Sequence, residues 1–397
     1  MFEKVVIHRS VEGPAVSIGD IAEALLFYQS VHLVLDYASL SGLIDAIDMV
    51  GVLSLLARDN VSAVYVEEML ATHTRTATNG QEFHGFCAIT VGGDRSSPRQ
   101  KSKKERLAYL LQRKGHHRGD ALRLAERFFN VVPFKTLSSD YFIKGGIPEA
   151  ARADLDDSNY VLEAVRQYGS ATGVEEIENA DRVGIDQTEV GFRILSNLDF
   201  KALNSRRTAR DLSVGQISEA SALCPILDAR AAIVLASHYG GEFVTSDRIS
   251  KIVRMRYGEL LKRTGISTEE LRVLHDVTLP EYPHVREVIN SGSRSFDEFL
   301  LLLDKSRKFR SWIKSVNPDA KLAHEYLKSI TADSWFAKFP VKSVRYALTT
   351  AVSMVHPGIG AALSAGDSLL LDKLVRGWRP SHFVEGHLRP FLGKEKA

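Results

Sequence analysis

The sequence predicts a mixed α/β fold that is rich in helices, followed by an all-helical C-terminal region. Two apolar runs at residues 31–35 and 61–66 have the length and composition of buried strands. Segments with apolar residues at helical spacing flank these runs, and that alternation is typical of a parallel sheet. From residue 265 onward no segment favours a strand, and Ser267 and Ser295 stand where they would cap helices.

The N-terminal segment, residues 1–93, contains most of the expected strands. The expected elements are a helix over 18–28, a strand over 31–35 ending at Asp36, a helix over 40–56 interrupted by Gly51, a strand over 61–66 and a short helix from Glu67. Threonine and glycine dominate residues 72–93, which we expect to be irregular.

Residues 94–120 are strongly basic and form the best candidate for a boundary, an exposed linker running into a helix near Glu105. The charges would hold nucleic-acid phosphates, or they only keep the linker solvated. The candidate nucleic-acid-binding residues are Arg99, Lys101, Lys103, Lys104, Arg106, Arg113 and Lys114.

Residues 121–262 return to α/β character and are expected to pack with the N-terminal segment. Helices are expected over 120–130, 159–169, 214–238 with a break near Pro225, and 246–262, and a strand over 242–245; residues 191–198 suit either a strand or a helix.

The last expected domain covers residues 263–397 and is helical. Residues 346–366 contain no Asp, Glu, Lys or Arg, and this length approaches a membrane span. Pro357 and Gly358 interrupt the run, so two buried helices are the main expectation and a membrane-inserting hairpin is the alternative.

The composition is that of an ordinary globular protein: 397 residues, 44% hydrophobic and 25% charged, with a net charge of +2. This small net charge makes no case for nucleic acid or membrane from the whole chain. Two distant cysteines, Cys87 and Cys224, exclude a disulfide framework and a thiolate zinc cluster. The first residues lack the pattern of a signal peptide, so a cytoplasmic location is expected.

Acidic residues follow two of the expected strands. Asp36 ends the first strand, Thr245-Ser246-Asp247 follows the strand at 242–245, and Asp228 stands near the start of a helix. The carboxyl ends of parallel strands meet at one edge of a sheet, so these acids are expected to approach each other, with Glu67 or Glu68 adding an oxygen. Such a cluster favours Mg²⁺ or Mn²⁺, which promotes phosphodiester cleavage.

These two short segments resemble parts of a PIN-type ribonuclease domain, in which a strand ends in Asp and a later strand ends in Thr-x-Asp. The resemblance implies that Asp36, Glu68, Asp228 and Asp247 are the catalytic acids, with Asp36, Asp228 and Asp247 as metal ligands. About 190 residues separate Asp36 from Asp228, more than the compact family has.

A structural interpretation of the same acids stays open. Asp36 and Asp247 each precede an expected helix and would cap it, and Asp228 would favour the dipole of a helix beginning near Pro225.

Three classes of function follow from these features. The first is a soluble cytosolic interaction or regulatory protein, whose helical C-terminal region binds a protein partner or a second copy and which needs no cofactor. The second is a nuclease that uses Mg²⁺ or Mn²⁺ to cleave RNA or DNA. The third is a membrane-disrupting effector, although a membrane partner is the least expected. A role in bacterial defence or stress would suit the second and third classes.

Overall fold

The protein is described from a computed structural model. It describes residues 2–92, 96–97, 100–141, 145–210, 215–244, 247–256, 274–276, 279, 282–315, 326 and 380–393. The chain divides into two compact units, Phe2–Glu269 and Glu270–Ala397, the second including Met1. The mixed α/β fold is confirmed. The described elements of the second unit are helical, and residues 346–366 lie outside the described part of the chain.

The first unit contains a five-stranded parallel sheet, here sheet A, with the strand order β6-β3-β2-β1-β9. Its strands are β1 (Lys4–Ile7), β2 (Ser30–Leu35), β3 (Val61–Val66), β6 (Phe134–Lys135) and β9 (Glu242–Phe243). The expected strands over 31–35 and 61–66 are therefore confirmed. Both run nearly fully buried, as strands covered on two faces do.

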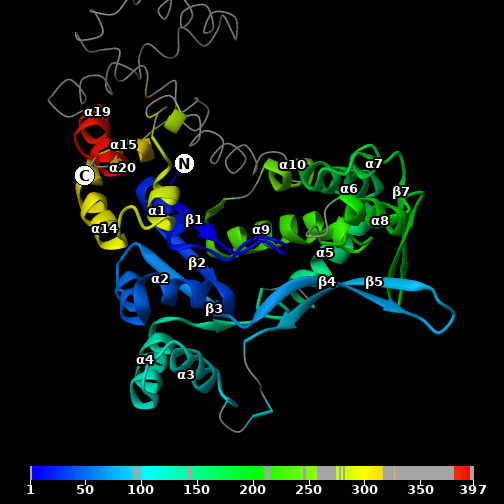
Figure 1. Cartoon of the computed structure of the whole chain (residues 1–397), viewed down its shortest axis with the longest axis horizontal. Helices are drawn as coiled ribbons and strands as arrows, with labels where there is room; N and C mark the ends of the chain where they lie inside the picture. Colours follow the sequence, from blue (N-terminus) through cyan, green and yellow to red (C-terminus); the bar gives the residue numbers. More distant parts are fainter. Residues whose placement is uncertain are drawn as a thin grey trace, which may run out of the picture. The chain divides into compact units, whose positions relative to one another are not determined.

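Helices cover both faces of sheet A. Between consecutive strands lie α1 (Ile18–Phe27) and α2 (Tyr37–Leu56), then α3 (Lys103–Arg113) and α4 (Arg118–Val131). The opposite face packs Val6, Val34 and Val64 against α9 (Cys224–Tyr239) and α5 (Gly146–Arg152). Figure 1 shows α9 lying along β1. The interruption of α2 lies at Asp48, with φ 56°, rather than at Gly51.

A second, antiparallel sheet, here sheet B, has the order β4-β5-β8-β7. Its strands are β4 (Glu68–Thr76), β5 (Glu82–Thr90), β7 (Val183–Thr188) and β8 (Gly191–Ser196). The expected short helix from Glu67 is wrong, because β4 starts two residues after β3 ends and carries the chain from one sheet into the other (Figure 1). β4 and β5 form a β-hairpin over residues 68–90. The irregular structure expected over 72–93 is therefore wrong for 72–76 and 82–90, where threonine favours strands.

The other helices that the structure describes in the first unit lie around a second apolar core. They are η1 (Ala153–Asp156), α6 (Ser158–Thr172), α7 (Glu175–Glu178), α8 (Phe200–Arg210), η2 (Ser221–Leu223) and α10 (Asp247–Arg256). The core joins Tyr160 and Val161 of α6 to Phe192 of β8 and Ile226 of α9. Pro225 lies in the first turn of α9, where proline is tolerated, so the helix begins there instead of breaking.

The helices described in the second unit pack partly through aromatic rings. They are α13 (Val285–Asn290), α14 (Phe296–Lys305), α15 (Arg307–Ser315), α19 (Pro380–Phe383), the π-helical turn η4 (Val384–Leu388) and α20 (Arg389–Leu392). Phe309 stacks on Phe383 with ring centroids 4.9 Å apart. The expected cap at Ser295 is confirmed, because its Oγ accepts a hydrogen bond of 3.2 Å from the backbone N–H of Glu298, whose carboxylate accepts one of 2.7 Å from the backbone N–H of Ser295.

By length and composition alone, two helical segments among the described residues are apolar enough to cross a membrane, Tyr37–Leu56 and Ser221–Tyr239. Their most apolar windows are 44% and 72% buried within the protein. Both segments contact strands of sheet A.

Candidate functional site

The carboxyl edge of sheet A contains a small cavity. The loop after β1, Asp36 after β2 and Glu68 after β3 all reach it. Its volume is about 30 Å³, and its lining residues are His8, Arg9, Ser10, Val11, Val34, Asp36, Val66, Glu68, Met69, Leu70, Leu137 and Leu235. The cavity therefore brings together two of the four acids that the sequence predicts.

Asp36 is 6% exposed and has two kinds of partner. Its Oδ1 accepts a hydrogen bond of 2.7 Å from the backbone N–H of Ser39, so Asp36 caps α2, as the structural interpretation expects. Its Oδ2 lies 3.3 Å from Nη1 of Arg9. One carboxylate thus stabilises a helix terminus and faces a cation at the cavity.

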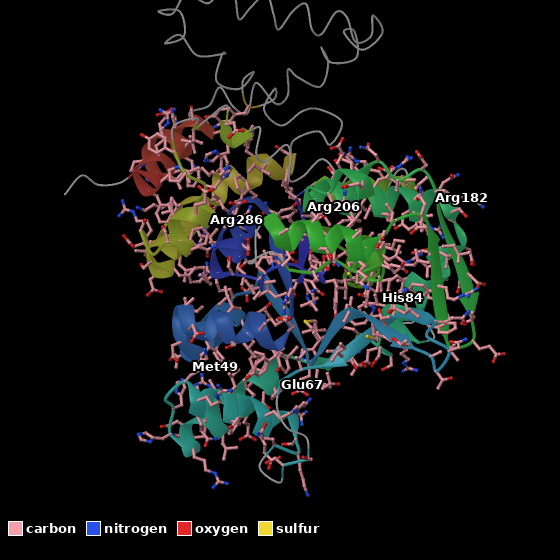
Figure 2. The ribbon with its side chains drawn as sticks, turned by 45° about the vertical axis from the view of Figure 1, so that its right-hand side comes forward. Met49, Glu67, His84, Arg182, Arg206 and Arg286 are labelled. Carbon is pink, nitrogen blue, oxygen red and sulfur yellow. The ribbon has the colours of Figure 1, made fainter. Side chains whose placement is uncertain are left out.

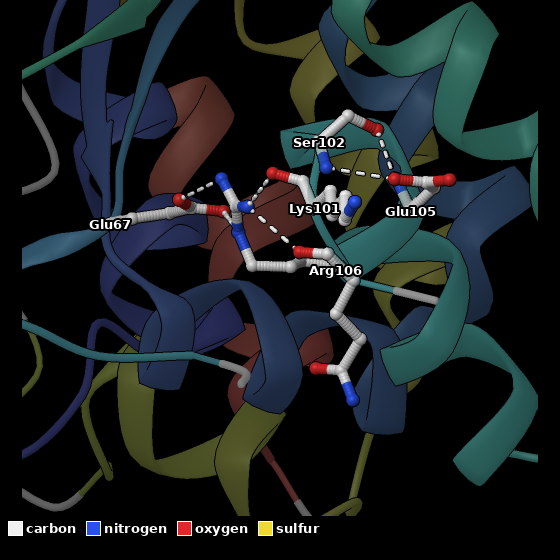
Figure 3. Close-up of polar contacts among 6 residues, drawn as sticks. Glu67, Lys101, Ser102, Glu105 and Arg106 are labelled. Atoms are coloured by element: carbon white, nitrogen blue, oxygen red, sulfur yellow. Dashed lines mark hydrogen bonds and ion pairs between the residues drawn. The ribbon is translucent and has the colours of Figure 1, made fainter. Parts of the chain in front are cut away.

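Glu67, in the bend between β3 and β4, and Glu68, the first residue of β4, have different partners. Glu68 faces the cavity, and its oxygens accept hydrogen bonds from the Oγ–H of Ser138 at 2.7 Å and the backbone N–H at 2.9 Å. Glu67 is 1% exposed, and its two oxygens pair with Arg106 at 2.6 and 2.8 Å (Figure 3). Both carboxylate oxygens of Glu67 are therefore used in a buried ion pair, and Glu67 does not line the cavity.

Asp228 reaches the loop after β1 from far along the chain, whereas no described contact brings Asp247 to this edge. Asp228, on α9, is 3% exposed, and its Oδ1 accepts a 2.7 Å hydrogen bond from the backbone N–H of Val11. It anchors the loop after β1 and does not line the cavity. Asp247 begins α10 shortly after β9, the strand beside β1; its side chain lies outside the description.

The charges at the cavity favour a cation. Two carboxyl groups and one guanidinium line it. Burial lowers the pKa of His8, so that imidazole is neutral at pH 7 and adds no positive charge. Asp36 and Glu68 supply hard oxygen donors of the kind that Mg²⁺ and Mn²⁺ prefer.

The three described acids do not by themselves form a tight cluster. Among the side chains that the structure describes, the group of three whose ligand atoms lie within 4.8 Å of one another is His275, Asp276 and His284, in the second unit. Asp36 and Glu68 therefore offer two protein ligands, and water would complete the shell of a cation there, as is common for Mg²⁺.

The basic segment mostly pairs within the protein. Arg106 is buried: besides Glu67 it donates to the carbonyls of Gln100 and Lys101 at 3.0 and 2.7 Å (Figure 3). The Arg106 guanidinium therefore pairs with groups inside the protein and is not presented to solvent, where the expected contact with nucleic acid would be made. Three further candidates have internal partners: Lys103 lies over the rings of Phe129 and Phe134, Lys104 pairs with Glu126, and Lys114 pairs with Asp45.

Three of the predicted bases are exposed, and one of them, Lys114, pairs with Asp45. Lys101 precedes α3 and Arg113 ends it, and both are exposed to solvent. Arg99 lies outside the described residues. Any electrostatic contribution of this segment to binding nucleic acid therefore falls first on Lys101 and Arg113.

A larger, open cavity of about 1050 Å³ lies beside sheet B, and sequence reasoning missed it. Glu82 and Glu219 are among its lining residues. Behind Glu219 stands the buried His84 of β5, labelled in Figure 2, whose Nε2 lies 3.1 Å from Glu219 and whose Nδ1 lies 3.0 Å from the hydroxyl of Thr74. These residues are far apart in sequence, so no local motif marks them.

Comparison with known proteins does not assign the chain to a family. No family model matches the chain, and neither a curated protein nor a solved structure matches it.

Proposed function

We propose that this chain is a divalent-metal-dependent phosphodiesterase of the nuclease class, with its site at the carboxyl edge of sheet A. The observation that carries the proposal is that Asp36 and Glu68, at the ends of neighbouring strands, line one cavity. Ligands of open α/β sheets bind at this edge.

The size of the cavity indicates the kind of ligand. A volume of about 30 Å³ is close to that of one water molecule, so an ion fits and an organic cofactor does not. Asp36 and Glu68 would hold Mg²⁺ or Mn²⁺. When bound, the metal supplies activation of water and stabilisation of charge on a phosphodiester.

Arg9 has one role in the metal-free protein and another in the metal-bound protein. Without a cation, its guanidinium balances Asp36 at 3.3 Å. A cation takes over that balance, and the guanidinium, whose side chain is 25% exposed, is then free to pair with a phosphate. Asp228 positions Arg9 indirectly, because it fixes the loop at Val11.

The resemblance to PIN-type ribonucleases supports the proposal, with one change of role. Sheet A joins β9 beside β1 although most of the chain between β3 and β9 forms sheet B and its helices. The long separation in sequence therefore does not keep Asp228 from the loop at the carboxyl edge. In this proposal Asp228 positions the loop instead of binding metal.

The test is cleavage of labelled RNA and single-stranded DNA with Mg²⁺ or Mn²⁺, beside EDTA. The informative variant is Asp36→Asn/Glu68→Gln, because Asn still caps a helix and Gln still accepts from Ser138. The matched control is Asp157→Asn: Asp157 also caps a helix, α6, and also lies near an arginine, with 3.2 Å to Arg256. We expect metal-dependent cleavage that the double variant loses and the control retains. No cleavage, or cleavage that the double variant retains, contradicts the proposal.

An interaction or regulatory function in the cytosol is the second candidate. The observation that favours it is Leu301 of α14, which is 65% exposed although its neighbours Leu302 and Leu303 are buried. If a protein partner or a second copy covers Leu301, the Leu301→Lys variant should lose that binding and the Asp36→Asn variant should retain it. Sedimentation velocity and co-purification measure both outcomes.

A further inference from the structure

The second unit holds a group of metal-ligating side chains that the carboxyl edge does not involve. His275 and Asp276 lie in the short helical segment 274–276, and His284 is the residue before α13. One ligand atom from each of the three lies within 4.8 Å of the other two. The group combines two imidazoles with one carboxylate.

The hydrogen bonding of His275 prepares one ring nitrogen as a ligand. Its Nε2 lies 3.3 Å from the backbone carbonyl of Pro283, and a carbonyl only accepts, so Nε2 carries the proton. In the neutral ring, Nδ1 then presents its lone pair, 3.7 Å from Oδ1 of Asp276. Metal-binding histidines characteristically donate their other N–H to a carbonyl or carboxylate, which fixes the tautomer and the ring orientation.

The two imidazoles of the group lie against each other. The rings of His275 and His284 stack with centroids 3.8 Å apart and planes at 24°. Neutral imidazoles are ligands, whereas protonated ones are not.

Binding requires the spacing to close and one ring to turn, because the two imidazoles are stacked and a metal lies in the plane of each imidazole that binds it. Two nitrogens bound to Zn²⁺ at about 2.0–2.1 Å stand about 3.3 Å apart in tetrahedral geometry. From an upper limit of 4.8 Å, closure amounts to about 1.5 Å at most. His284 is also held at its backbone, where its N–H donates to Glu287 at 3.1 Å.

We propose that His275, Asp276 and His284 bind one divalent transition-metal ion of the Zn²⁺ type. Mixed nitrogen and oxygen donors suit such borderline ions, in contrast to the oxygen donors of Asp36 and Glu68. The ion ties residues 275–276 to the start of α13. Three protein ligands leave one tetrahedral position for water.

The experiment uses the full chain, stripped of metal and titrated with Co²⁺ as a spectroscopic substitute for Zn²⁺. We expect one equivalent to give the visible absorption of a tetrahedral site, and Zn²⁺ to displace it. The variant His275→Gln/His284→Gln removes this absorption, while His387→Gln, in η4 of the same unit, retains it.

Two further measurements keep the result clear. Zn²⁺ raises the unfolding temperature of the parent chain and of Asp36→Asn/Glu68→Gln, but not of His275→Gln/His284→Gln, because ligand bound to the native state stabilises it. Circular dichroism of the metal-free histidine variant must match the parent. Absence of saturable Co²⁺ binding, or one equivalent still bound by the folded histidine variant, overturns the proposal whatever the outcome at the carboxyl edge.

Discussion

Nη1 of Arg9 lies 3.3 Å from Oδ2 of Asp36, so the loop after β1 is electrostatically joined to the end of the neighbouring strand β2. The Asp36 side chain is 9% exposed and that of Arg9 is 25% exposed. The pair is thus shielded from solvent on the acidic side and open on the basic side. This asymmetry suits the proposed exchange, in which a divalent metal ion replaces the Arg9 guanidinium as the partner of the Asp36 carboxylate.

The Glu67–Arg106 pair predicts a large effect on stability. Replacing Arg106 by Met leaves Glu67 buried without its bidentate partner, and such a loss costs about 3–5 kcal/mol. Arg113→Met changes an exposed residue of the same helix and should cost less than about 0.5 kcal/mol. Urea unfolding at pH 7 measures both. Equal costs would show that the pair does not stabilise the interior.

Gly146 should be irreplaceable for steric reasons. A Cβ there would lie 2.3 Å from the carbonyl oxygen of Leu137 and 2.3 Å from the carbonyl carbon of Ser138, the residue that binds Glu68. Gly173 has a similar positive φ, +66° against +68°, but open space around it.

Gly173→Ala therefore measures backbone strain alone, about 1–2 kcal/mol, and Gly146→Ala adds a clash. We expect Gly146→Ala to lose clearly more unfolding free energy than Gly173→Ala. Similar losses would contradict the close approach of α5 to residues 137–138.

His32 predicts a loss of stability in acid. It is 6% exposed, its ring stacks on Tyr239 at 3.7 Å, and burial, with Lys4 and His238, lowers its pKa to about 4. The unfolded chain binds the proton below about pH 6.5, while the folded protein does not until about pH 4, so stability falls as the pH drops through that window.

The full loss from His32 is about 3 kcal/mol. Unfolding free energy measured between pH 7 and pH 4 should fall less steeply in His32→Gln than in the parent. His117→Gln, at an exposed position, provides the control. An unchanged slope in His32→Gln would rule out His32 as a source of the acid sensitivity.

The basic segment predicts an uneven contribution to binding nucleic acid. Lys101→Ala/Arg113→Ala removes exposed charges and should weaken binding of single-stranded RNA, with a shallower dependence on salt. Lys104→Ala/Lys114→Ala removes charges that already pair with Glu126 and Asp45 and should have a smaller effect. Fluorescence anisotropy at several salt concentrations distinguishes the two, and the reverse order would contradict the placement of the exposed charges.

Local patterns in the sequence predict much of sheet A. The apolar runs of β2 and β3 and the helical periods of α1, α4 and α6 lie close to their expected residues, because buried strands and amphipathic helices leave strong local signals. The sequence does not predict the β4–β5 hairpin, because its Thr and Gly residues suggest a loop. In the structure Gly85 pairs with His73 on the neighbouring strand, and the His73 ring occupies the space that a side chain at position 85 would need.

The candidate sites depend on contacts that periodicity does not encode. The sequence offers Glu67 and Glu68 as equals, and only the burial of Arg106 separates the structural acid from the one at the cavity. Asp228 reaches Val11 across 217 positions, and no local pattern fixes such a pairing. His275 and His284 are nine positions apart, a spacing that no helical metal motif marks.

The most direct measurement is the binding of Mn²⁺, followed by electron paramagnetic resonance of the free ion. The parent chain should bind an equivalent that Asp36→Asn/Glu68→Gln loses and Asp157→Asn keeps. Arg9→Gln should bind Mn²⁺ about 2- to 5-fold more tightly, because a competing cation worth up to about 1 kcal/mol is gone. If Mn²⁺ binding is equal in the parent and the double variant, or weaker in Arg9→Gln, the carboxyl edge is not a metal site and Asp36 is a helix cap.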